Sequence, residues 1–361
     1  MIIVSKIARI AAQVATLALY LLTFAAAYGG HLSPYVWATP SVLTLFLPYL
    51  AIATFIVTII WAIRIRLYIT ALGVITIIAC WSPIMQVFPF GYERVAQHDT
   101  QFSLLTFNIL HADDVKDSTN VAGRALSFIL DQDADIVCLQ EFLGKEESAF
   151  KSFDPAKKDS LLLKYRYFIS DPHNDLTLLS KYPAKLVRET AHYSDYFFDI
   201  YNLEINHHKL TLINVHMTPY RLNDEERNVV TDIQSVGTAR KSIREFKGSI
   251  LHKIKESFRQ RADAAAALRE IIDEIHGPLI ICGDFNDVPA SFAYRTIRGK
   301  DLSDAYTETN FGHTYTYNEH LFLFHIDQIL YKGNLRALKV NRRKIDTSDH
   351  YPLYSVFEFT N

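Results

Sequence analysis

Several apolar segments of this 361-residue chain end in a polar side chain that can take part in metal or acid–base chemistry. These residues are Asn108, Glu141, His216, Asp284 and Asn286. The runs before them, such as Leu-Leu-Thr-Phe and Ile-Ile-Cys-Gly, are typical of buried strands. In open α/β sheets ligands bind beyond the carboxyl ends of the strands. A single polar strand end is ordinary, but the recurrence predicts that these side chains share one cleft.

Carboxylate, amide and imidazole groups in one cleft suit a hard cation such as Mg²⁺, which prefers oxygen ligands and keeps several waters. Such a cation bridges to phosphate oxygens and stabilises the charge that develops during hydrolysis. The chain has no His-Glu-x-x-His helix of a zinc peptidase, no Gly-x-Ser-x-Gly elbow and no Gly-rich phosphate loop ending in Lys-Ser/Thr. The residue types therefore indicate metal-dependent hydrolysis of a phosphoester.

Two later motifs add a histidine beside acids. His325-Ile326-Asp327-Gln328 leads an apolar strand, and Ser348-Asp349-His350-Tyr351-Pro352 lies near the end of the chain. A carboxylate can hold a histidine in one tautomer, which makes it a competent acid or base. Asp327 is the candidate partner of His350. The alternative for Asp349-His350 is an ordinary exposed turn before Pro352.

In order and spacing, six short motifs resemble those of the endonuclease/exonuclease/phosphatase superfamily over about residues 100–361. They are Thr106-Phe107-Asn108, Leu139-Gln140-Glu141, Asn214-Val215-His216, Gly283-Asp284-Phe285-Asn286, Ile326-Asp327 and Ser348-Asp349-His350. The superfamily includes DNase I, exonuclease III-like AP endonucleases, inositol polyphosphate 5-phosphatases and neutral sphingomyelinases. The resemblance implies a four-layer α/β sandwich, in which two packed β-sheets are flanked by helices.

The resemblance also implies a metal site. Glu141 would be the principal ligand of Mg²⁺, or of Mn²⁺ in its place. Asn108 would lie close by, and Asp349 would lie near the metal.

The same resemblance implies catalytic roles for five residues. Asp284 would orient or deprotonate the attacking water, and Asn286 would hydrogen-bond the phosphate. His216 would donate to the scissile phosphate oxygen. His350, paired with Asp327, would stabilise the transition state or transfer a proton.

Two positions depart from the family pattern. Asn174-Asp175 stands where small, glycine-rich residues are frequent, and His325 stands where an Arg often precedes the Ile-Asp pair. We expect both changes to affect substrate contacts.

The elements that position these groups follow from hydrophobic periodicity. Strands are predicted over 102–110, 136–140, 176–179, 210–215, 279–282 and 326–330, and helices over 121–131 and 258–275. Pro278 after Gly277 stops the second helix. Alternating strands and helices over this length predict an α/β domain with buried sheets.

Three apolar stretches without Lys, Arg, Asp or Glu precede this domain: Ile10–Tyr28, Val42–Ile63 and Leu67–Phe90. A helix needs roughly 20 apolar residues to cross about 30 Å of hydrocarbon. The pattern predicts three transmembrane helices, a membrane anchor over residues 1–92 and a catalytic domain over residues 100–361. The first stretch alone also fits a signal peptide, with a basic start and small residues at its end.

Basic residues in the short loops predict the orientation. Lys6 and Arg9 precede the first stretch, Arg64 and Arg66 separate the second from the third, and the loop from Gly29 to Ser41 has neither Lys nor Arg. The N-terminus is therefore expected in the cytoplasm. The expected protein is an integral protein of a bacterial inner membrane with an extracytoplasmic catalytic domain.

The segment from Tyr220 to Gln260 is longer than the connection at this place in compact family members. Around its end lie Arg240, Lys241, Arg244, Lys247, Lys253, Lys255, Arg259 and Arg261 among apolar residues. A basic amphipathic helix can lie on an anionic membrane or grip phosphate. The alternative is a solvated helix that packs its apolar stripe on the domain.

The totals narrow the function further. The formal net charge is −2, without the basic excess of a dedicated nucleic-acid binder. The three cysteines are too few for a disulfide framework, and Cys138 and Cys282 lie in apolar strands as inert thiols. The expected function is hydrolysis of a lipid-headgroup phosphoester at the membrane surface, as by a sphingomyelinase-like phospholipase C or a lipid phosphatase. An extracytoplasmic nuclease and an inactive interaction module are the alternatives.

Overall fold

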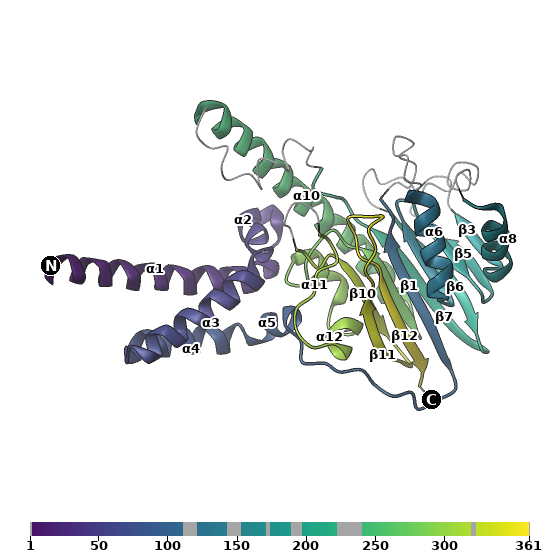
Figure 1. Cartoon of the computed structure of the whole chain (residues 1–361), viewed down its shortest axis with the longest axis horizontal. Helices are drawn as coiled ribbons and strands as arrows, with labels where there is room; N and C mark the ends of the chain where they lie inside the picture. The colour runs from purple at the N-terminus through teal and green to yellow at the C-terminus, as the bar shows by residue number, and fades with distance from the viewer. Residues whose placement is uncertain are drawn as a thin grey trace.

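A computed structural model describes residues 2–110, 121–142, 153–170, 174–188, 197–221, 240–318 and 323–360. The side chains of residues 2–5, 121–122, 188, 197 and 240–247 lie outside this description. Helices at the N-terminal end project from one side of a sandwich of two sheets (Figure 1).

Within the described residues, the two sheets contain six strands each. The first has the order β11-β12-β1-β2-β4-β3 and the second the order β5-β6-β7-β8-β10-β9. The first comprises β1 (Gln101–Asn108), β2 (Ile136–Gln140), β3 (Tyr167–Ser170), β4 (Thr177–Ser180), β11 (Leu335–Arg342) and β12 (Leu353–Phe359). The second comprises β5 (Ala184–Arg188), β6 (Phe197–Ile205), β7 (His208–His216), β8 (Leu279–Asp284), β9 (Ser303–Asp304) and β10 (Asp327–Lys332).

Each sheet has one parallel pair at its centre. β1 runs parallel to β2, and β7 runs parallel to β8. The other paired strands are antiparallel. Because parallel strands end at the same edge of a sheet, the four central strands deliver their last residues together.

Helices cover the outer faces of both sheets. The helices of the sandwich are α6 (Val121–Gln132), α8 (Pro155–Lys164), α10 (Arg240–Glu274), α11 (Phe292–Arg298) and α12 (Ala305–Thr309). α6 and α8 contribute Leu126 and Leu161 to the core of the first sheet, and α10 contributes Leu268 to the core of the second. A third core joins the sheets and contains the free, fully buried Cys138 and Cys282. The expected four-layer α/β sandwich is confirmed.

The predicted strands all form, but β3, β5, β6, β9, β11 and β12 were missed. In β11 and β12 buried and more exposed residues alternate only partly, so neither shows the continuous apolar run that marked the central strands. The helix predicted over 258–275 begins instead at Arg240 and has 35 residues.

The N-terminal helices are α1 (Ile2–Tyr28), the 3₁₀ turn η1 (Gly29–His31), α2 (Pro34–Thr44), α3 (Leu47–Ile63), α4 (Leu67–Ala79) and α5 (Trp81–Val87). The helix over Lys6–His31 is long and apolar enough to cross a membrane. Two further pairs of helices are apolar enough only when taken together, and each is bent, by 57° between α2 and α3 and by 64° between α4 and α5. The second predicted stretch contains the end of α2 and all of α3, and the third contains α4 and α5. Three spans result if each pair counts as one.

Proline explains why these two stretches are not continuous helices. Pro48 lies in the first turn of α3 and Pro83 lies in α5, and proline lacks the backbone N–H that a helix interior needs. Each of the two predicted stretches is therefore interrupted by a bend. With 13 residues, α4 alone is about 20 Å long, short of the roughly 30 Å of a bilayer core.

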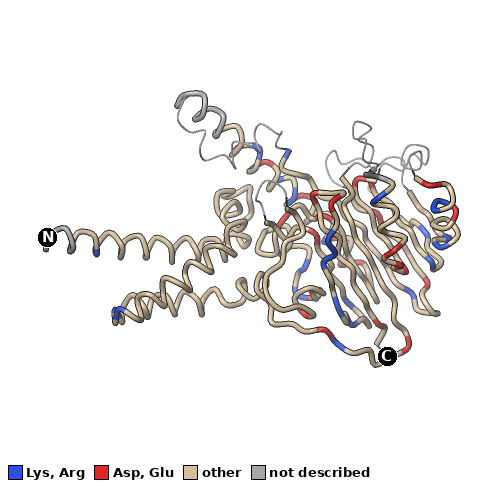
Figure 2. The backbone as a smooth tube through the Cα atoms, in the orientation of Figure 1, with Lys and Arg blue, Asp and Glu red and all other residues tan. Residues whose placement is uncertain are grey.

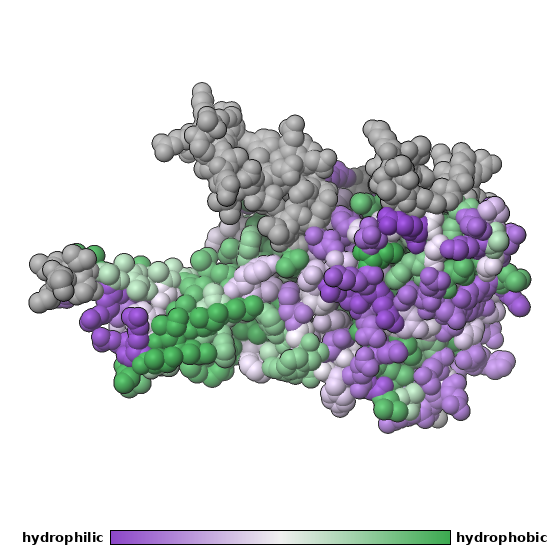
Figure 3. All heavy atoms as spheres, in the orientation of Figure 1, coloured by the Kyte–Doolittle hydropathy of each residue, from purple (hydrophilic) through white to green (hydrophobic). Residues whose placement is uncertain are grey.

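Polar side chains in this helical part point between the helices. The hydroxyls of Thr23 and Thr54 lie 2.7 Å apart, and Trp61 Nε1 donates to Thr16 Oγ1 at 2.9 Å. The outward surface is apolar, as the green band over α1, α3 and α4 shows (Figure 3). Interhelical hydrogen bonds inside and an apolar surface outside are the arrangement that lipid favours.

The basic segment is part of the domain where it is described. Phe258 is buried, and Arg261 is fully buried in an ion pair with Asp287. Arg259 pairs with Glu256 at 3.2 Å, while Lys253 and Lys255 are half-buried. Residues 222–239 lie outside the described part of the chain. The described section of α10 therefore packs on the domain, and Arg261 is not available to membrane or substrate.

Candidate active site

Asn108, at the end of β1, joins the two sheets. Its Nδ2 donates to Glu141 Oε1 and to Asp284 Oδ2, each at 3.0 Å. Asn108 ends β1 and Glu141 follows β2 in the first sheet, whereas Asp284 ends β8 of the second. The polar strand ends that the sequence singled out are thus brought together at one edge of the sandwich.

Asp284 lies at the centre of this group. Its carboxylate accepts hydrogen bonds from the backbone N and the Nδ2 of Asn286, at 2.7 Å and 3.0 Å. Asn286 adopts a left-handed conformation with φ of +50°, which turns its side chain back. Burial raises the pKa of Asp284 to about 6, with His350 opposing and Asp327 adding to the rise.

Gly283 allows β7 and β8 to approach closely just before Asp284. Its φ is +136°, and a Cβ there would lie 2.0 Å from the carbonyl oxygen of Val215. Only glycine fits, so the first residue of the Gly-Asp-Phe-Asn motif has a structural purpose.

His350 and Asp327 form the pair that the sequence predicted. Nδ1 of His350 lies 2.9 Å from Asp327 Oδ2, and Nε2 lies 3.7 Å from Asp284 Oδ2. Burial lowers the pKa of His350, but Asp327 and Asp284 outweigh it and raise that pKa to about 10. His350 is buried, so the alternative of an exposed turn is wrong.

His216 has an equivalent partner that the sequence reasoning missed. Its Nδ1 lies 2.8 Å from Asp175 Oδ2. Its Nε2 faces the centre, 3.7 Å from Glu141 Oε1 and 3.9 Å from Asp284 Oδ2. This buried nitrogen has no hydrogen-bond partner among the described residues. Against the effect of burial, Asp175, Asp284 and Glu141 raise the pKa of His216 to about 9.

Asn174-Asp175 was noticed only as a departure from the family pattern. Asn174 accepts from the Leu176 N–H at 2.9 Å and donates to Asp199 at 2.9 Å, which fixes the turn before β4. Asp175 is thereby held against His216. The available clue was that Asp175 lies just before a predicted strand. Nothing in the spacing of the sequence pairs this residue with His216, which is 41 residues away.

The remaining predicted residues, Glu141 and Asp349, flank Asn108. Glu141 has a left-handed φ of +57° directly after β2, and its side chain is 15% exposed. Ser348 Oγ donates to the Asn108 carbonyl at 2.8 Å and accepts from the His350 N–H at 3.0 Å. Asp349 lies between these two anchored residues.

The residue types predicted as metal ligands suit a hard divalent cation, because Mg²⁺ prefers carboxylate and amide oxygens. The amide oxygen of Asn108 accepts from the Leu110 N–H at 3.0 Å in this structure. Asp284, Asp327 and His350 also form a buried group whose ligand atoms lie within 4.8 Å of one another. In that group Nδ1 of His350 is already engaged with Asp327, so we interpret it as a hydrogen-bonded acid–base network.

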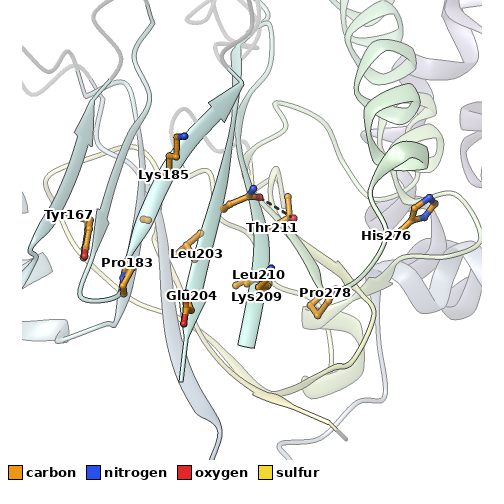
Figure 4. A pocket seen from close by; sticks show the side chains of 12 residues that line it. Tyr167, Pro183, Lys185, Leu203, Glu204, Lys209, Leu210, Thr211, His276 and Pro278 are labelled. Carbon is orange, nitrogen blue, oxygen red and sulfur yellow. Dashed lines mark hydrogen bonds between the residues drawn. The ribbon is translucent and has the colours of Figure 1, made fainter. Parts of the chain in front are cut away.

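A groove of about 470 Å³ lies elsewhere, at the opposite ends of β7 and β8. Tyr167, Lys185, Glu204, Thr211 and His276 are among its lining residues (Figure 4). None of the predicted site residues lines this groove.

The Endonuclease/Exonuclease/phosphatase family matches residues 105–350, and the chain belongs to this family. Members hydrolyse phosphoester bonds and generally use divalent metals, so this protein is a hydrolase of that superfamily. A domain of unknown function (DUF8431) matches residues 8–87. No curated protein matches the chain.

Solved structures of similar proteins cover nearly three quarters of the chain. The catalytic domain of human Nocturnin with a bound sulfate is 20% identical, with 73% of this chain and 97% of that chain covered and a TM-score of 0.48. A humanized TDP2 of D. rerio is 17% identical, with 72% of this chain and 100% of that chain covered and a TM-score of 0.47. An endonuclease/exonuclease/phosphatase family protein of Bacteroides thetaiotaomicron is 15% identical, with 73% of this chain and 99% of that chain covered and a TM-score of 0.49.

Removing the central carboxylate or the network histidine tests the site. We expect Asp284→Asn and His350→Ala each to lower kcat on a nitrophenyl phosphodiester by about 10²- to 10⁴-fold, the usual size of acid–base contributions. Circular dichroism should show a folded protein. Asp304→Asn is the matched control, because Asp304 is a buried carboxylate of the same sheet that binds Tyr294 and Thr307. Near-normal hydrolysis by either site variant would remove that residue from its role.

The partner of His216 makes a prediction about pH. A raised pKa keeps His216 protonated at neutral pH, so activity that needs its proton declines as pH rises through that pKa. Asp175→Asn removes the first charge that raises the pKa, and the basic limb of the pH–kcat profile should move to lower pH. An unchanged basic limb would show that His216 does not act as the proton donor.

Proposed function

We propose that the protein is a membrane-anchored, divalent-metal-dependent phosphoesterase that cleaves lipid-headgroup phosphoesters, as a phospholipase C-like phosphodiesterase or a lipid phosphatase. One observation carries this proposal: the loop that follows Asp284 and Asn286 packs directly on the apolar N-terminal helices. Val288 shares a buried cluster with Leu45, and Ala290 shares one with Ala26 and Ala27. An active centre at the base of an anchor is concentrated over lipid substrates.

The residues then divide the chemistry among them. Glu141, Asn108 and Asp349 would hold Mg²⁺ or Mn²⁺, which when bound supplies positive charge to the phosphate oxygens. Asp284, with a pKa of about 6, is ionised at neutral pH and able to accept a proton from the attacking water. Asn286, anchored to the Met217 carbonyl at 2.9 Å, fixes the position of that carboxylate.

The Nε2 atoms of both histidines face the carboxylate of Asp284, and each histidine is held by a different aspartate. His216, held by Asp175, presents a protonated Nε2 to the scissile phosphate oxygen. His350, held by Asp327, stabilises the transition state or transfers a proton. Donors aimed in advance at the oxygens that gain charge are the largest single contribution in many enzymes.

We take residues 1–92 as the anchor and residues 100–361 as the catalytic domain. The basic segments of the helical part lie at its far ends, remote from the sandwich (Figure 2). They correspond to Lys6 and Arg9 and to Arg64 and Arg66. The positive-inside rule supports a cytoplasmic location for these ends and an extracytoplasmic catalytic domain in a bacterial inner membrane.

Cysteine labelling tests this orientation. A cysteine introduced near Asn361, in a variant whose three native cysteines are replaced, should react with a membrane-impermeant maleimide in intact cells. A cysteine at Arg64 is the control and should react only after the cells are permeabilised. The reverse pattern would place the catalytic domain in the cytoplasm.

A substrate screen tests the reaction. Purified full-length protein in detergent is offered labelled phospholipids, plasmid DNA and RNA with Mg²⁺, Mn²⁺ or EDTA. We expect headgroup or phosphate release from lipid, loss of activity in EDTA and recovery with added Mg²⁺, because the charge on the phosphate needs a counter-cation. Asp284→Asn protein prepared in parallel excludes contaminating enzymes. Cleavage of nucleic acid without lipid would establish a nuclease instead, and activity in EDTA would contradict the metal site.

A further inference from the structure

The N-terminal helices touch the two segments that carry Asp284, Asn286 and Asp327. We infer that these helices position the catalytic loops, so that the active centre keeps its geometry only while the helical part is packed against it. Gly30 and Leu45 are the positioning residues. The inference rests on the proposed function only for the roles of the three site residues.

The first contact is made by Leu45, at the bend between α2 and α3. Leu45 is 6% exposed and shares a buried cluster with Phe258, Val288 and Ile326. Val288 comes two residues after Asn286, and Ile326 directly precedes Asp327. A cavity of only about 10 Å³ remains beside Leu45 and Val288, hardly the space of one water. Leu45 therefore fills the gap behind both catalytic segments with little slack.

The second contact is made by the backbone of Gly30 in η1. A Cβ at this position would lie 2.1 Å from the carbonyl oxygen of Ala290 and 2.9 Å from that of Ser291. Ser291 is the N-cap of α11, and Ala290 is buried against Ala26 and Ala27. The helical part thus meets the end of the catalytic loop backbone to backbone, without space for a methyl group.

The loop is held from its other side by α10. Arg261 is fully buried, lies 3.2 Å from Asp287 Oδ2 and donates to the Thr218 carbonyl at 2.9 Å. It therefore connects the segment after His216 with the segment after Asn286. Tyr35 of α2 in turn donates to Asp263 of α10. The loop is clamped between α10 and the helical part, which are themselves joined.

This clamping has a chemical consequence. The left-handed backbone of Asn286 and its two hydrogen bonds to Asp284 depend on the path of the residues that follow, as well as on the contact of Asn286 with the Met217 carbonyl. A displacement of about 1 Å in a catalytic group can cost roughly 100-fold in rate. A change in the helical part that shifts residues 288–291 should therefore reach the chemistry without any contact to substrate.

The test compares Gly30→Ala with Gly73→Ala in the full-length protein. The three atoms nearest to a Cβ at Gly73 belong to Thr58 and Tyr20 of the helical part, so that variant disturbs the helices away from the loops. We expect Gly30→Ala to lower kcat on the nitrophenyl phosphodiester by about 10- to 100-fold with KM changed less than about twofold. Gly73→Ala should keep kcat within about twofold after correction for the folded fraction.

Leu45 offers a second test. Leu45→Ala should lower kcat, whereas Leu45→Met should leave kcat near the wild-type value because it keeps the volume of the side chain. Ile69→Ala is the control, because Ile69 is also buried but lies remote from the loops. A general loss of stability would affect Leu45→Ala and Ile69→Ala alike.

A readout without activity keeps the inference separate from the proposed function. Hydrogen exchange of the amides in residues 285–291 should accelerate at least about tenfold in Gly30→Ala and not in Gly73→Ala. Wild-type protein without phosphoesterase activity would overturn the proposed function alone. Unchanged kcat and unchanged exchange in Gly30→Ala, or equal changes in both glycine variants, would overturn the positioning role.

Discussion

The buried carboxylate of Asp284 is the constraint around which the rest of this structure is arranged. An ionised carboxylate with 1% exposure is costly unless hydrogen bonds and opposite charges surround it. Asn108 donates to it from the opposite sheet, Asn286 donates from its own loop, and the Nε2 atoms of His216 and His350 lie within 3.9 Å. Each histidine is held by a further carboxylate, Asp175 or Asp327. The site is a chain of alternating negative and positive groups.

This chain explains features of the sandwich that are otherwise arbitrary. The carboxylate and its partners meet only because β1, β2, β7 and β8 end at one edge. Beneath them a polar layer links the sheets: Gln140 Nε2 donates to Asn214 Oδ1 at 2.6 Å, and Asn214 donates to the Leu139 carbonyl at 3.0 Å. Gln140 and Asn214, which belong to two of the family motifs, therefore link the two sheets rather than taking part in the chemistry.

The bends in the apolar helices have a related purpose. The break around Leu45 turns a buried leucine toward Val288 and Ile326, and η1 places Gly30 against the backbone of Ala290. The N-terminal helices thus form one wall behind the loops that carry Asp284, Asn286 and Asp327.

The sequence by itself determined which residues gather at the site, because strand ends and short motifs are local patterns. Asn108, Glu141, His216, Asp284 and Asn286 were found from their place after apolar runs, and the central strands from those runs themselves. It also determined that the N-terminal part is apolar and that Cys138 and Cys282 are buried thiols. Only the tertiary structure decided the partner of His216, the bends of the apolar stretches, the strands that flank the centre of each sheet, and the approach of Gly30 to Ala290. These features depend on contacts between residues far apart in the chain. Hydrophobic periodicity records whether a residue is buried, but it does not say which distant segment buries that residue.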